Sequence, residues 1–478
     1  MTFLKFFSEL HTLRQAPAFA QGYERTRQGV RRGKTLCLEV VFCRRGTTKL
    51  FLLKVNVGNK SMFKKIKGTQ DFLDLSLFDF IVSSAKDHLQ CYGFEQIVTP
   101  ILEPTELFKR SLGVETDVVQ KEMFIIDRGG DKTKESICLR PELTAPTARA
   151  FIENKIQQTP WKVFSIGPAF RHERPQKGRF RQFHQINIEL IGSASVAQDA
   201  RLIAMLDRLF HEKFLITNSV LQLNYLGCFE DRKTYKNLLI EFLGSVEGDL
   251  CSTCVQRKQA NILRVLDCKN PDCQKLYKNA PTMIDTLCKT CAQEWETLQT
   301  QLSLLSVSFV VTPNLVRGLD YYCKTVFEFI SDSLGAQSSI CGGGRYDQLI
   351  SQLGGKEDQP SIGVGIGIER LLLILEQNKE LLPIQQKPAL HLILPLTEKQ
   401  QTLALLLADT LHGHDICTDV LLEGDSLKSM MRKANKRGAT YCLILGEEEQ
   451  ENKTVTVKQM ITGDSKTVKQ SELVTYLR

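Results

Sequence analysis

A basic loop followed by a strand with one polar face constrains this chain more than any other segment. Residues 170–190 carry five Lys/Arg before the alternation begins. In a strand, Gln185, Asn187 and Glu189 lie on one face and the intervening aliphatic residues on the other. The pattern predicts a sheet with one face in the core and the other against a polar ligand. The alternative is a basic hairpin on a solvated sheet.

Glycines at every second position mark another unusual strand. Gly363, Gly365 and Gly367 would leave one of its faces without side chains, so that a planar base can approach the backbone. A helix predicted from Glu369 would place Arg370 in its first turn, where free amides favour phosphate. The pattern therefore predicts a nucleotide site, with tight sheet packing as the alternative.

Composition bounds the class of protein. A length of 478 residues, 42% of them hydrophobic, predicts roughly three domains with real cores. No run of about 18 apolar residues occurs, so no membrane span is expected. Fifteen cysteines without a signal-peptide pattern indicate a reducing compartment. We therefore expect a cytoplasmic protein that has no membrane partner.

Residues 1–61 differ from the rest of the chain. They contain twelve Lys/Arg and three Asp/Glu, a charge of +9, which leaves −1 for residues 62–478 because the total is +8. RNA binding by the main body would therefore need local basic patches. Three interpretations of 1–61 stay open: translation that begins at Met62, an organelle-targeting peptide, or a nucleic-acid-binding arm. The second would place the protein in an organelle.

Five motifs resemble those of class II aminoacyl-tRNA synthetases, and more narrowly those of the histidyl-tRNA synthetase family. They are LRPELT at 139–144, FRHERPQKGRFRQFHQINIEL at 170–190, RGLDYY at 317–322, GGGRYD at 342–347 and GVGIGIER at 363–370. The motifs follow the family's order at similar spacings, and the likeness runs from about residue 62 to the C-terminus. RGLDYY is particular to the histidine enzymes.

The resemblance implies an α+β architecture. An antiparallel sheet flanked by helices would occupy 62–385, with a cysteine-rich insert at about 229–302, and an α/β anticodon-binding domain would occupy 388–478. A strand at 92–103 is the family's dimer contact, so a homodimer is expected. The implied reaction activates histidine with ATP to histidyl-adenylate and transfers it to the 3′ end of tRNA(His), releasing AMP and diphosphate. The alternative is the non-catalytic, synthetase-like regulatory subunit of ATP phosphoribosyltransferase.

Arginines dominate the catalytic residues that the resemblance implies. Arg171 would bind the α-phosphate, Arg370 the terminal phosphates, and Arg317 both the histidine carboxylate and the α-phosphate. Arginine suits this work because it is always charged and forms paired hydrogen bonds to oxyanions. The residues assigned to ATP, which would bring Mg²⁺, are Arg171, Arg179, Gly365, Gly367 and Arg370.

The histidine pocket implied by the resemblance is polar. Glu142, Thr144 and Gln185 would bind the ammonium group; Glu189 and Tyr322 would bind the two ring nitrogens, beside Tyr321; and the 342–347 backbone would line the pocket. A buried carboxylate facing a phenol satisfies an imidazole but no apolar rival. Leu143 departs from the bacterial pattern, which often has glycine there. Glu142 has an alternative role as a helix cap.

Two basic surfaces are candidates for tRNA contacts. The loop residues Arg174, Gln176, Lys177 and Arg179 would meet phosphates or the acceptor end. Lys428, Arg432 and Lys436 recur every four residues and predict one basic stripe on a helix that ends before Gly438. The alternative for the stripe is an ordinary solvated face.

Six cysteines in the insert form three short spacings. Cys251 and Cys254, and likewise Cys288 and Cys291, form C-x₂-C hooks typical of tetrahedral Zn²⁺. These four are predicted to hold a structural zinc, with the remaining two, Cys268 and Cys273, as replacements. The alternative is six reduced, partly buried thiols.

Overall fold

The computed structural model describes residues 63–478 apart from 115, 127–134, 261, 269, 318, 320 and 386, and the backbone of 35–44 and 47–56. Two compact units form, Met1–Lys67 and Gly68–Arg478. In the first, strands β1 (Thr35–Arg44) and β2 (Thr47–Asn56) pair antiparallel. The other residues of 1–61, and with them the interpretations of that segment, lie outside the described residues.

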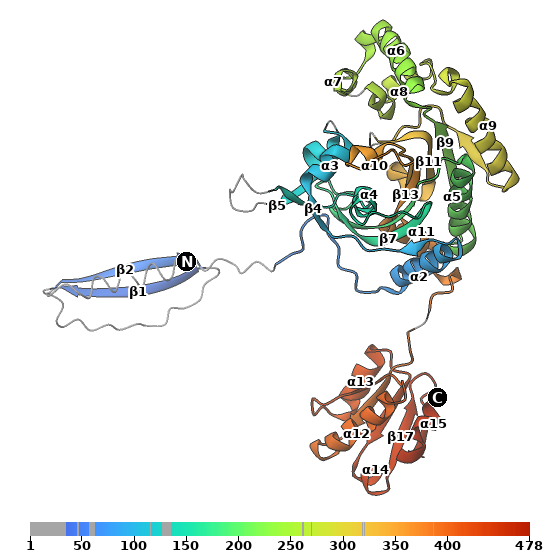
Figure 1. The fold of residues 1–478 in the computed structure, drawn as a ribbon. Coiled ribbons are helices and arrows are strands. Elements are labelled where there is room, and N and C mark those ends of the chain that lie inside the picture. Colours follow the sequence, from blue (N-terminus) through green and yellow to red (C-terminus); the bar gives the residue numbers. More distant parts are fainter. Residues whose placement is uncertain are drawn as a thin grey trace. The chain divides into compact units, whose positions relative to one another are not determined.

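An eight-stranded sheet organises the larger unit (Figure 1). Its order is β10 (Phe309–Val311), β9 (Ser219–Tyr225), β11 (Cys323–Ser331), β12 (Ser339–Arg345), β13 (Ser361–Gly367), β8 (Gln182–Ile191), β7 (Trp161–Phe170) and β3 (Glu95–Gln96). The strands from β9 to β7 pair antiparallel, and only the edge strands β10 and β3 pair parallel. The predicted antiparallel sheet is confirmed.

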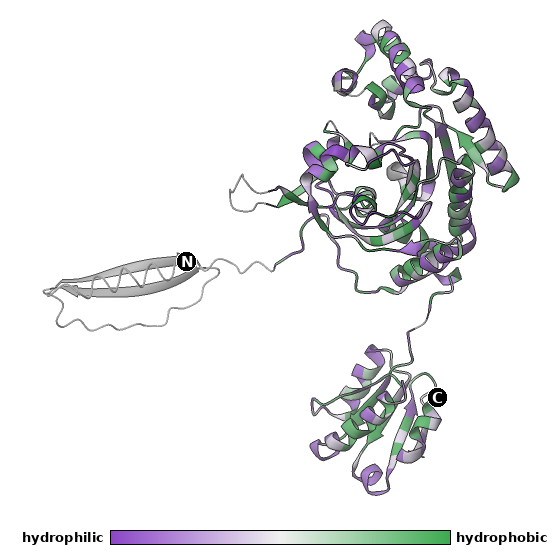
Figure 2. Ribbon diagram, in the orientation of Figure 1, coloured by the Kyte–Doolittle hydropathy of each residue, from purple (hydrophilic) through white to green (hydrophobic). Residues whose placement is uncertain are grey.

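Helices cover the apolar face of this sheet. They are α2 (Ser76–Cys91), α5 (Val196–Arg208), α9 (Lys289–Leu304) and α11 (Ile368–Leu375). Ile186, Ile188 and Leu190 of β8 share one buried cluster with residues of these four helices. Hydrophilic and hydrophobic residues interleave along α2 and α5, as expected of helices with one buried side (Figure 2). The polar residues of β8 must therefore point to the opposite face.

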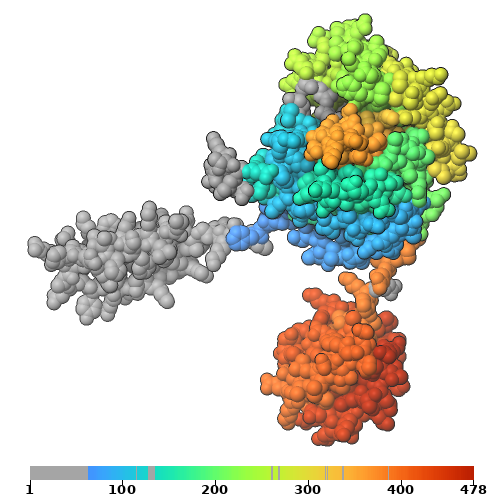
Figure 3. Space-filling model, in the orientation of Figure 1, coloured from blue at the N-terminus to red at the C-terminus, as the bar shows by residue number. Residues whose placement is uncertain are grey.

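Shorter elements pack on the other side. Helices α3 (Thr105–Leu112), α4 (Thr144–Glu153) and α10 (Leu349–Gln352) share a second buried cluster. On the surface, the orange segment that contains α10 lies beside blue and teal segments from distant parts of the chain (Figure 3). A three-stranded sheet of β4 (Leu102–Pro104), β6 (Ile137–Leu139) and β5 (Phe124–Ile126) accompanies them.

The prediction of one continuous strand at 92–103 is wrong. The segment divides into β3, in the main sheet, and β4, in the three-stranded sheet. Pro100 lies between them, and a proline has no amide N–H to donate to a strand ladder.

The insert is helical. It contains α6 (Phe229–Ser245), α7 (Ser252–Ala260), the 3₁₀ segment η4 (Ile262–Asp267) and α8 (Pro271–Tyr277), which share a separate buried cluster. The next helix, α9, instead contributes Trp295, Leu298 and Leu302 to the main core. The separate core of the insert thus lies before α9.

The C-terminal module is an α/β sandwich. Its sheet has the order β15 (Thr418–Val420), β14 (His391–Pro395), β16 (Tyr441–Leu445), β17 (Thr454–Gln459) and β18 (Ser465–Lys469). Its helices are α12 (Gln401–His412), α13 (Leu427–Lys436), α14 (Glu447–Glu451) and α15 (Leu473–Leu477). Ile393 packs with residues of α12, whereas Leu392 and Leu394 pack with residues of α13, so helices cover both faces.

Among the helices of the described residues, none combines the length and the apolar character that a bilayer crossing requires.

Candidate active site

A cavity opens on the polar face of the main sheet. The space inside it, including solvent at its open mouth, is about 910 Å³. The predicted site residues that line it are Glu142, Thr144, Arg171, Arg179, Gln185, Arg317, Tyr321, Tyr322, Gly365, Gly367 and Arg370. Among the described residues, Glu189 and Gly363 do not line it, and Gly342 alone represents the predicted 342–347 segment. The structure therefore brings together residues that lie far apart in the sequence.

Two of the arginines are anchored by backbone carbonyls. Arg171 follows β7, donates from Nε to the Pro141 carbonyl at 2.9 Å and lies over the Phe183 ring. Arg370 donates to the carbonyls of Gly178 at 3.1 Å and Ser339 at 2.7 Å. Carbonyl oxygens orient a guanidinium without neutralising its charge. Arg171 is in addition 3.9 Å from the carboxylate of Glu173.

Burial and nearby like charges both act on the pKa of Arg370. Burial lowers the pKa of this guanidinium, and the nearby cations Arg179 and Arg171 lower it further. Arg179 also forms an ion pair with Glu173. A cluster of partly buried cations is unfavourable in isolation and becomes favourable when a polyanion binds.

Arg317 reaches the cavity from the loop after β10. Its guanidinium forms an ion pair with Glu328 at 3.2 Å, while its Nε atom is buried without a hydrogen-bond partner among the described residues. It occupies the space that a side chain at Gly342 would fill, because a Cβ atom there would overlap the guanidinium. Within the motif that carries Arg317, Gly318 and Asp320 lie outside the described residues.

The two carboxylate oxygens of Glu142 cap helix α4. They accept hydrogen bonds from the amides of Thr144 at 2.7 Å and Ala145 at 2.8 Å. Burial raises the pKa of this carboxyl group, and the two amides act in the opposite direction. The alternative role as a cap is therefore observed, on a residue that also lines the cavity.

Gln185 presents an unsatisfied acceptor. Its Oε1 atom is buried without a hydrogen-bond partner among the described residues, and its side chain lines the cavity. A buried amide oxygen is costly without a donor, which an ammonium group would supply.

Glu189 is enclosed rather than open to the cavity. The Tyr346 hydroxyl donates to one of its oxygens, and Asn187 Nδ2 donates to the other at 2.8 Å. Burial raises the pKa of this carboxyl to about 7. The predicted facing phenol was that of Tyr322, whereas the phenol that bonds Glu189 here belongs to Tyr346.

Neighbouring side chains occupy much of the bare face of β13. A Cβ atom at Gly363 would overlap the carboxylate of Glu189, and one at Gly365 would overlap the amide of Gln185. The glycines therefore make room for polar residues of β8, the adjacent strand. Gly365 and Gly367 nevertheless line the cavity, as predicted.

Sequence reasoning missed several lining residues. Phe183 lies on the same face of β8 as Gln185 and Asn187, so strand alternation was sufficient to find it. Glu369, a lining residue of α11, binds the backbone amide and the ring of His184 at 2.9 Å. Glu173 sits in the basic loop, where nothing local distinguishes it. Tyr346, which does not line the cavity but bonds Glu189, was also missed; it lies two residues after three glycines that drew attention to the backbone alone.

The two predicted basic surfaces are formed. At the tip of the loop between β7 and β8, the backbones of Gln176 and Arg179 pair with each other. Arg174, Gln176 and Lys177 are exposed there, while Arg179 turns into the cavity. In the C-terminal module, α13 carries the stripe Lys428, Arg432 and Lys436, and all three residues are exposed.

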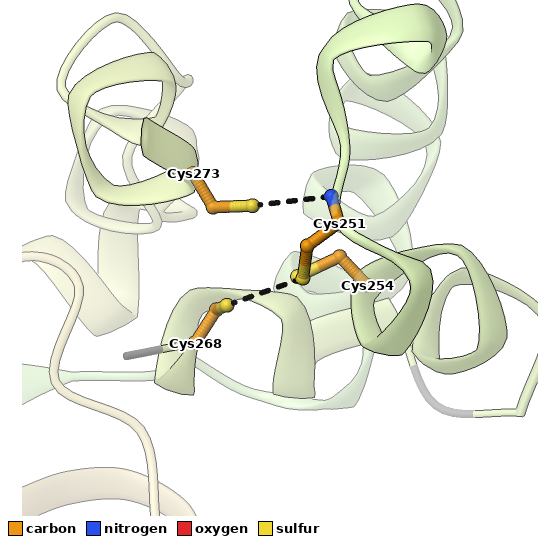
Figure 4. A group of neighbouring side chains, drawn as sticks. All are labelled: Cys251, Cys254, Cys268 and Cys273. Atoms are coloured by element: carbon orange, nitrogen blue, oxygen red, sulfur yellow. Dashed lines mark hydrogen bonds between the residues drawn. The ribbon is translucent and has the colours of Figure 1, made fainter. Parts of the chain in front are cut away.

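The predicted set of four zinc-binding thiols is wrong. Cys251 and Cys254 lie with Cys268 and Cys273, whereas Cys288 and Cys291 lie with Cys228 and Asp231 (Figure 4 shows the first group). The reason is topological: Cys288 immediately precedes α9, which packs against α5 in the main core and not within the insert. Cys268 and Cys273, which were predicted as replacement ligands, take the places of Cys288 and Cys291.

Fold and site together define a class. An antiparallel sheet, a cavity with four arginines beside acidic and amide groups, and a separate α/β module are features of a class II aminoacyl-tRNA synthetase. A family model described as "Histidyl-tRNA synthetase" matches residues 78–371, and one described as "Anticodon binding domain" matches 391–478. The chain belongs to the histidyl-tRNA synthetase family.

Individual relatives agree. The histidine–tRNA ligase of Clostridioides difficile is 42% identical over 419 residues, covering 87% of this chain and 99% of that protein. The histidine–tRNA ligase of Aquifex aeolicus is 41% identical over 414 residues, covering 86% and 99%. The crystal structure of apo Staphylococcus aureus histidyl-tRNA synthetase superposes with a TM-score of 0.72 at 32% identity, covering 87% and 100%.

The ligase prediction is confirmed over the regulatory-subunit alternative. A solved structure described as an ATP phosphoribosyltransferase regulatory subunit/histidyl-tRNA synthetase, from Bacillus halodurans, matches with a TM-score of 0.55 at 20% identity, a likeness of fold alone. The ligases of C. difficile and A. aeolicus match at about twice that identity and over nearly their whole length.

Proposed function

We propose that this chain carries out its family's reaction, ATP-dependent ligation of histidine to tRNA, in the cavity on the polar face of the main sheet. One observation supports this assignment above the others. Arg171, Arg179, Arg317 and Arg370 come from three separated segments and line one cavity, beside the unsatisfied Gln185 oxygen. Such an arrangement suits a substrate with several phosphates next to an ammonium group.

In the first step, a carboxylate oxygen of histidine attacks the α-phosphorus of MgATP. The new P–O bond forms as the bond to the β-phosphate oxygen breaks, and diphosphate leaves. Both reactants are anions, so catalysis consists of positioning and of neutralising charge on phosphate. Arg171 stabilises the α-phosphate, Arg370 the departing phosphates, and Arg317 holds the carboxylate against the α-phosphorus. No side-chain base is required.

Histidine is selected by groups that an apolar amino acid leaves unsatisfied. The Gln185 oxygen accepts from the ammonium group, together with Glu142 and Thr144. Tyr321 and Tyr322 line the same cavity and would contact the ring. Glu189 does not line the cavity, so its effect on the ring nitrogens would be electrostatic, with Tyr346 as its hydrogen-bond partner. Unpaired buried polar groups can discriminate by roughly 10⁴-fold.

In the second step, a hydroxyl at the 3′ end of tRNA attacks the carbonyl carbon of the adenylate, and AMP leaves. The exposed Arg174, Gln176 and Lys177, in the loop between β7 and β8, would meet the acceptor end. Contacts of this type to phosphates position the RNA without reading its sequence. The stripe on α13 is proposed as the anticodon-side contact.

A homodimer is part of the proposal. Leu102, Phe124 and Leu139 stand in register on one face of the three-stranded sheet, and Leu102 is 52% exposed. An apolar sheet face open to water favours a protein partner. A second copy of this chain is the partner proposed.

Histidine-dependent exchange of diphosphate into ATP tests the first step directly. Arg317→Ala should slow exchange by about 10²–10³ because a cation on the developing charge is lost. The matched control is Arg208→Ala, which removes an exposed arginine from α5. Circular dichroism and the thermal midpoint check that both variants fold. Near-normal exchange by a folded Arg317→Ala variant would remove this arginine from the mechanism.

A further inference from the structure

Four cysteines of the insert converge at the geometry of a metal site. The sulfurs of Cys251, Cys254, Cys268 and Cys273 all lie within 4.8 Å of one another, and three of these cysteines are buried. The Cys251 and Cys268 sulfurs are 3.7 Å apart. A tetrahedral zinc site with Zn–S bonds of about 2.3 Å places its sulfurs about 3.8 Å apart. A disulfide would instead require about 2.05 Å.

The local backbone presents these sulfurs as metal hooks do. Cys251 immediately precedes α7, and Cys254 lies in its first turn; Cys268 follows η4, and Cys273 lies in the first turn of α8. Backbone amides donate to two of the sulfurs: Cys251 N–H to Cys273, and Asn270 N–H to Cys268, both at 3.4 Å. Such hydrogen bonds stabilise thiolates and fix the direction of the ligands.

We propose that Cys251, Cys254, Cys268 and Cys273 bind one structural Zn²⁺, which holds the inserted helices together. Four thiolates in a tetrahedron are the donor set that selects zinc or iron–sulfur chemistry. Because no ligand position is left open, the ion has a structural and not a catalytic role.

The insert needs a cross-link of this kind. Among the described residues, the fully buried part of its core is formed by Tyr235, Leu239, Leu243, Cys254, Ile262, Val265, Leu266, Cys268, Cys273, Tyr277 and Met283. Three of these are themselves proposed ligands. Helices α7 and α8 have nine and seven residues, too few for stability on their own. Small domains with so little core are usually stabilised by metals or disulfides. The described cysteines are all free thiols.

A second group of potential metal ligands is already held together by hydrogen bonds to Asp231. Cys228, Asp231, Cys288 and Cys291 also lie within 4.8 Å of one another. The Asp231 carboxylate, however, accepts from the amide of Cys228 at 3.1 Å and from that of Cys288 at 2.9 Å. It thereby caps α6 and ties the two ends of the insert together without an ion. We assign the metal to the four-thiol group alone.

Contacts link the insert to the active site. Val316, which precedes Arg317, packs against the insert's core. Arg232 of α6 donates to the Tyr322 carbonyl at 2.9 Å. Loss of the ion would therefore loosen supports of two cavity residues, and we expect the KM for histidine to rise in metal-free protein.

The test is metal analysis of the full chain purified without chelator or affinity tag. Wild type should contain about one zinc per chain. Cys268→Ser/Cys273→Ser should lose it, while Cys91→Ser/Cys417→Ser, which removes two exposed thiols elsewhere, should retain it. The proposal is overturned if fully active wild type contains less than about a tenth of an equivalent of zinc, or contains iron in its place. It is also overturned if the Cys268→Ser/Cys273→Ser variant keeps its metal.

If the Cys268→Ser/Cys273→Ser variant fails to fold, cobalt binding by the wild-type protein provides a second test. Wild type is stripped with a chelator and titrated with Co²⁺, whose tetrahedral thiolate complexes absorb strongly in the near ultraviolet and visible. One equivalent should saturate these bands, and added Zn²⁺ should abolish them. Absence of the bands from folded, stripped protein would contradict a four-thiolate site.

Discussion

Burial controls the ionisation of Glu189. The residue is 1% exposed and raised in pKa to about 7, even though Tyr346 and Asn187 hydrogen-bond its charged form. Desolvation therefore outweighs these bonds. A carboxyl group that titrates near neutrality beside a histidine pocket makes both stability and substrate binding sensitive to pH.

Replacement by glutamine isolates this effect. Because the folded pKa of Glu189 exceeds its ordinary value of 4.5, the folded state holds the proton more tightly, and its contribution to stability is lost as pH rises from about 4.5 to 7. This loss is at most about 3 kcal/mol. Glu189→Gln cannot titrate, so its free energy of unfolding should gain on that of wild type between pH 5 and 8.

Urea unfolding at several pH values measures the difference. The exposed Glu357→Gln provides the control and should run parallel to wild type. If the curve for Glu189→Gln is also parallel, the carboxylate of Glu189 is ionised across the whole range and the argument from burial fails.

At the scale of elements, the glycines of β12 and β13 set the position of the catalytic side chains. Gly342→Ala should displace Arg317, whose guanidinium fills the space beside it, and should slow diphosphate exchange nearly as much as Arg317→Ala, by about 10²-fold. Gly244→Ala is the control, because a Cβ atom there meets nothing within 4 Å. It should leave exchange unchanged. Full activity of Gly342→Ala would show that Arg317 has room to move.

Residue spacing in the sequence predicted the features that depend on neighbouring residues alone, such as the faces of a strand. The alternation along β8 assigned Ile186 and Gln185 to opposite faces, and the four-residue spacing of basic residues predicted the stripe on α13. The glycines at every second position predicted a bare face on β13. They did not predict that side chains of β8 would fill the space beside it, because the order of strands in a sheet is set by tertiary packing. Pro100 marked a break within 92–103 that the strand prediction overlooked.

Tertiary packing also decided the cysteines. By spacing alone, Cys288 and Cys291 are as good a pair of metal ligands as Cys251 and Cys254, because both pairs are C-x₂-C. What separates them is that Cys291 is buried in the main core, where α9 packs on α5. Partners of buried groups, such as Tyr346 for Glu189, are likewise set by which strands become adjacent.

At the scale of the whole molecule, assembly is argued from the three-stranded sheet. Leu102 and Ile126 are 52% and 38% exposed and lie on one face by register. Leu102→Glu/Ile126→Glu should weaken self-association by at least about 100-fold because two charges would be buried at the contact. Sedimentation velocity should then report a monomer where wild type is a dimer.

The control for assembly uses apolar residues elsewhere. Leu304 and Leu381 are 79% and 71% exposed, so Leu304→Glu/Leu381→Glu adds the same charge. This variant should sediment as wild type does. A monomeric wild type, or equal behaviour of the two variants, would reject the three-stranded sheet as the contact.

The basic stripe of α13 should act on tRNA and not on adenylation. Lys428, Arg432 and Lys436 are exposed, whereas the nearby Lys433 forms an ion pair with Asp425. Replacing the three stripe residues by alanine should raise the KM for tRNA by about 10-fold or more and flatten its dependence on salt, because fewer counterions are released on binding. Histidine-dependent exchange should not change, since that step takes place without tRNA.

A charge-matched triple variant in the same module separates the stripe from net charge. Lys399, Lys453 and Lys469 are also exposed, and their replacement by alanine removes the same three positive charges. If the stripe is a docking surface, this variant should show a much smaller rise in KM. Equal rises would mean that the module attracts RNA by its overall field, with no preferred face. A rise in neither variant would place the contacts to tRNA outside α13, because a docked helix cannot lose three cations without weakening a salt-dependent complex.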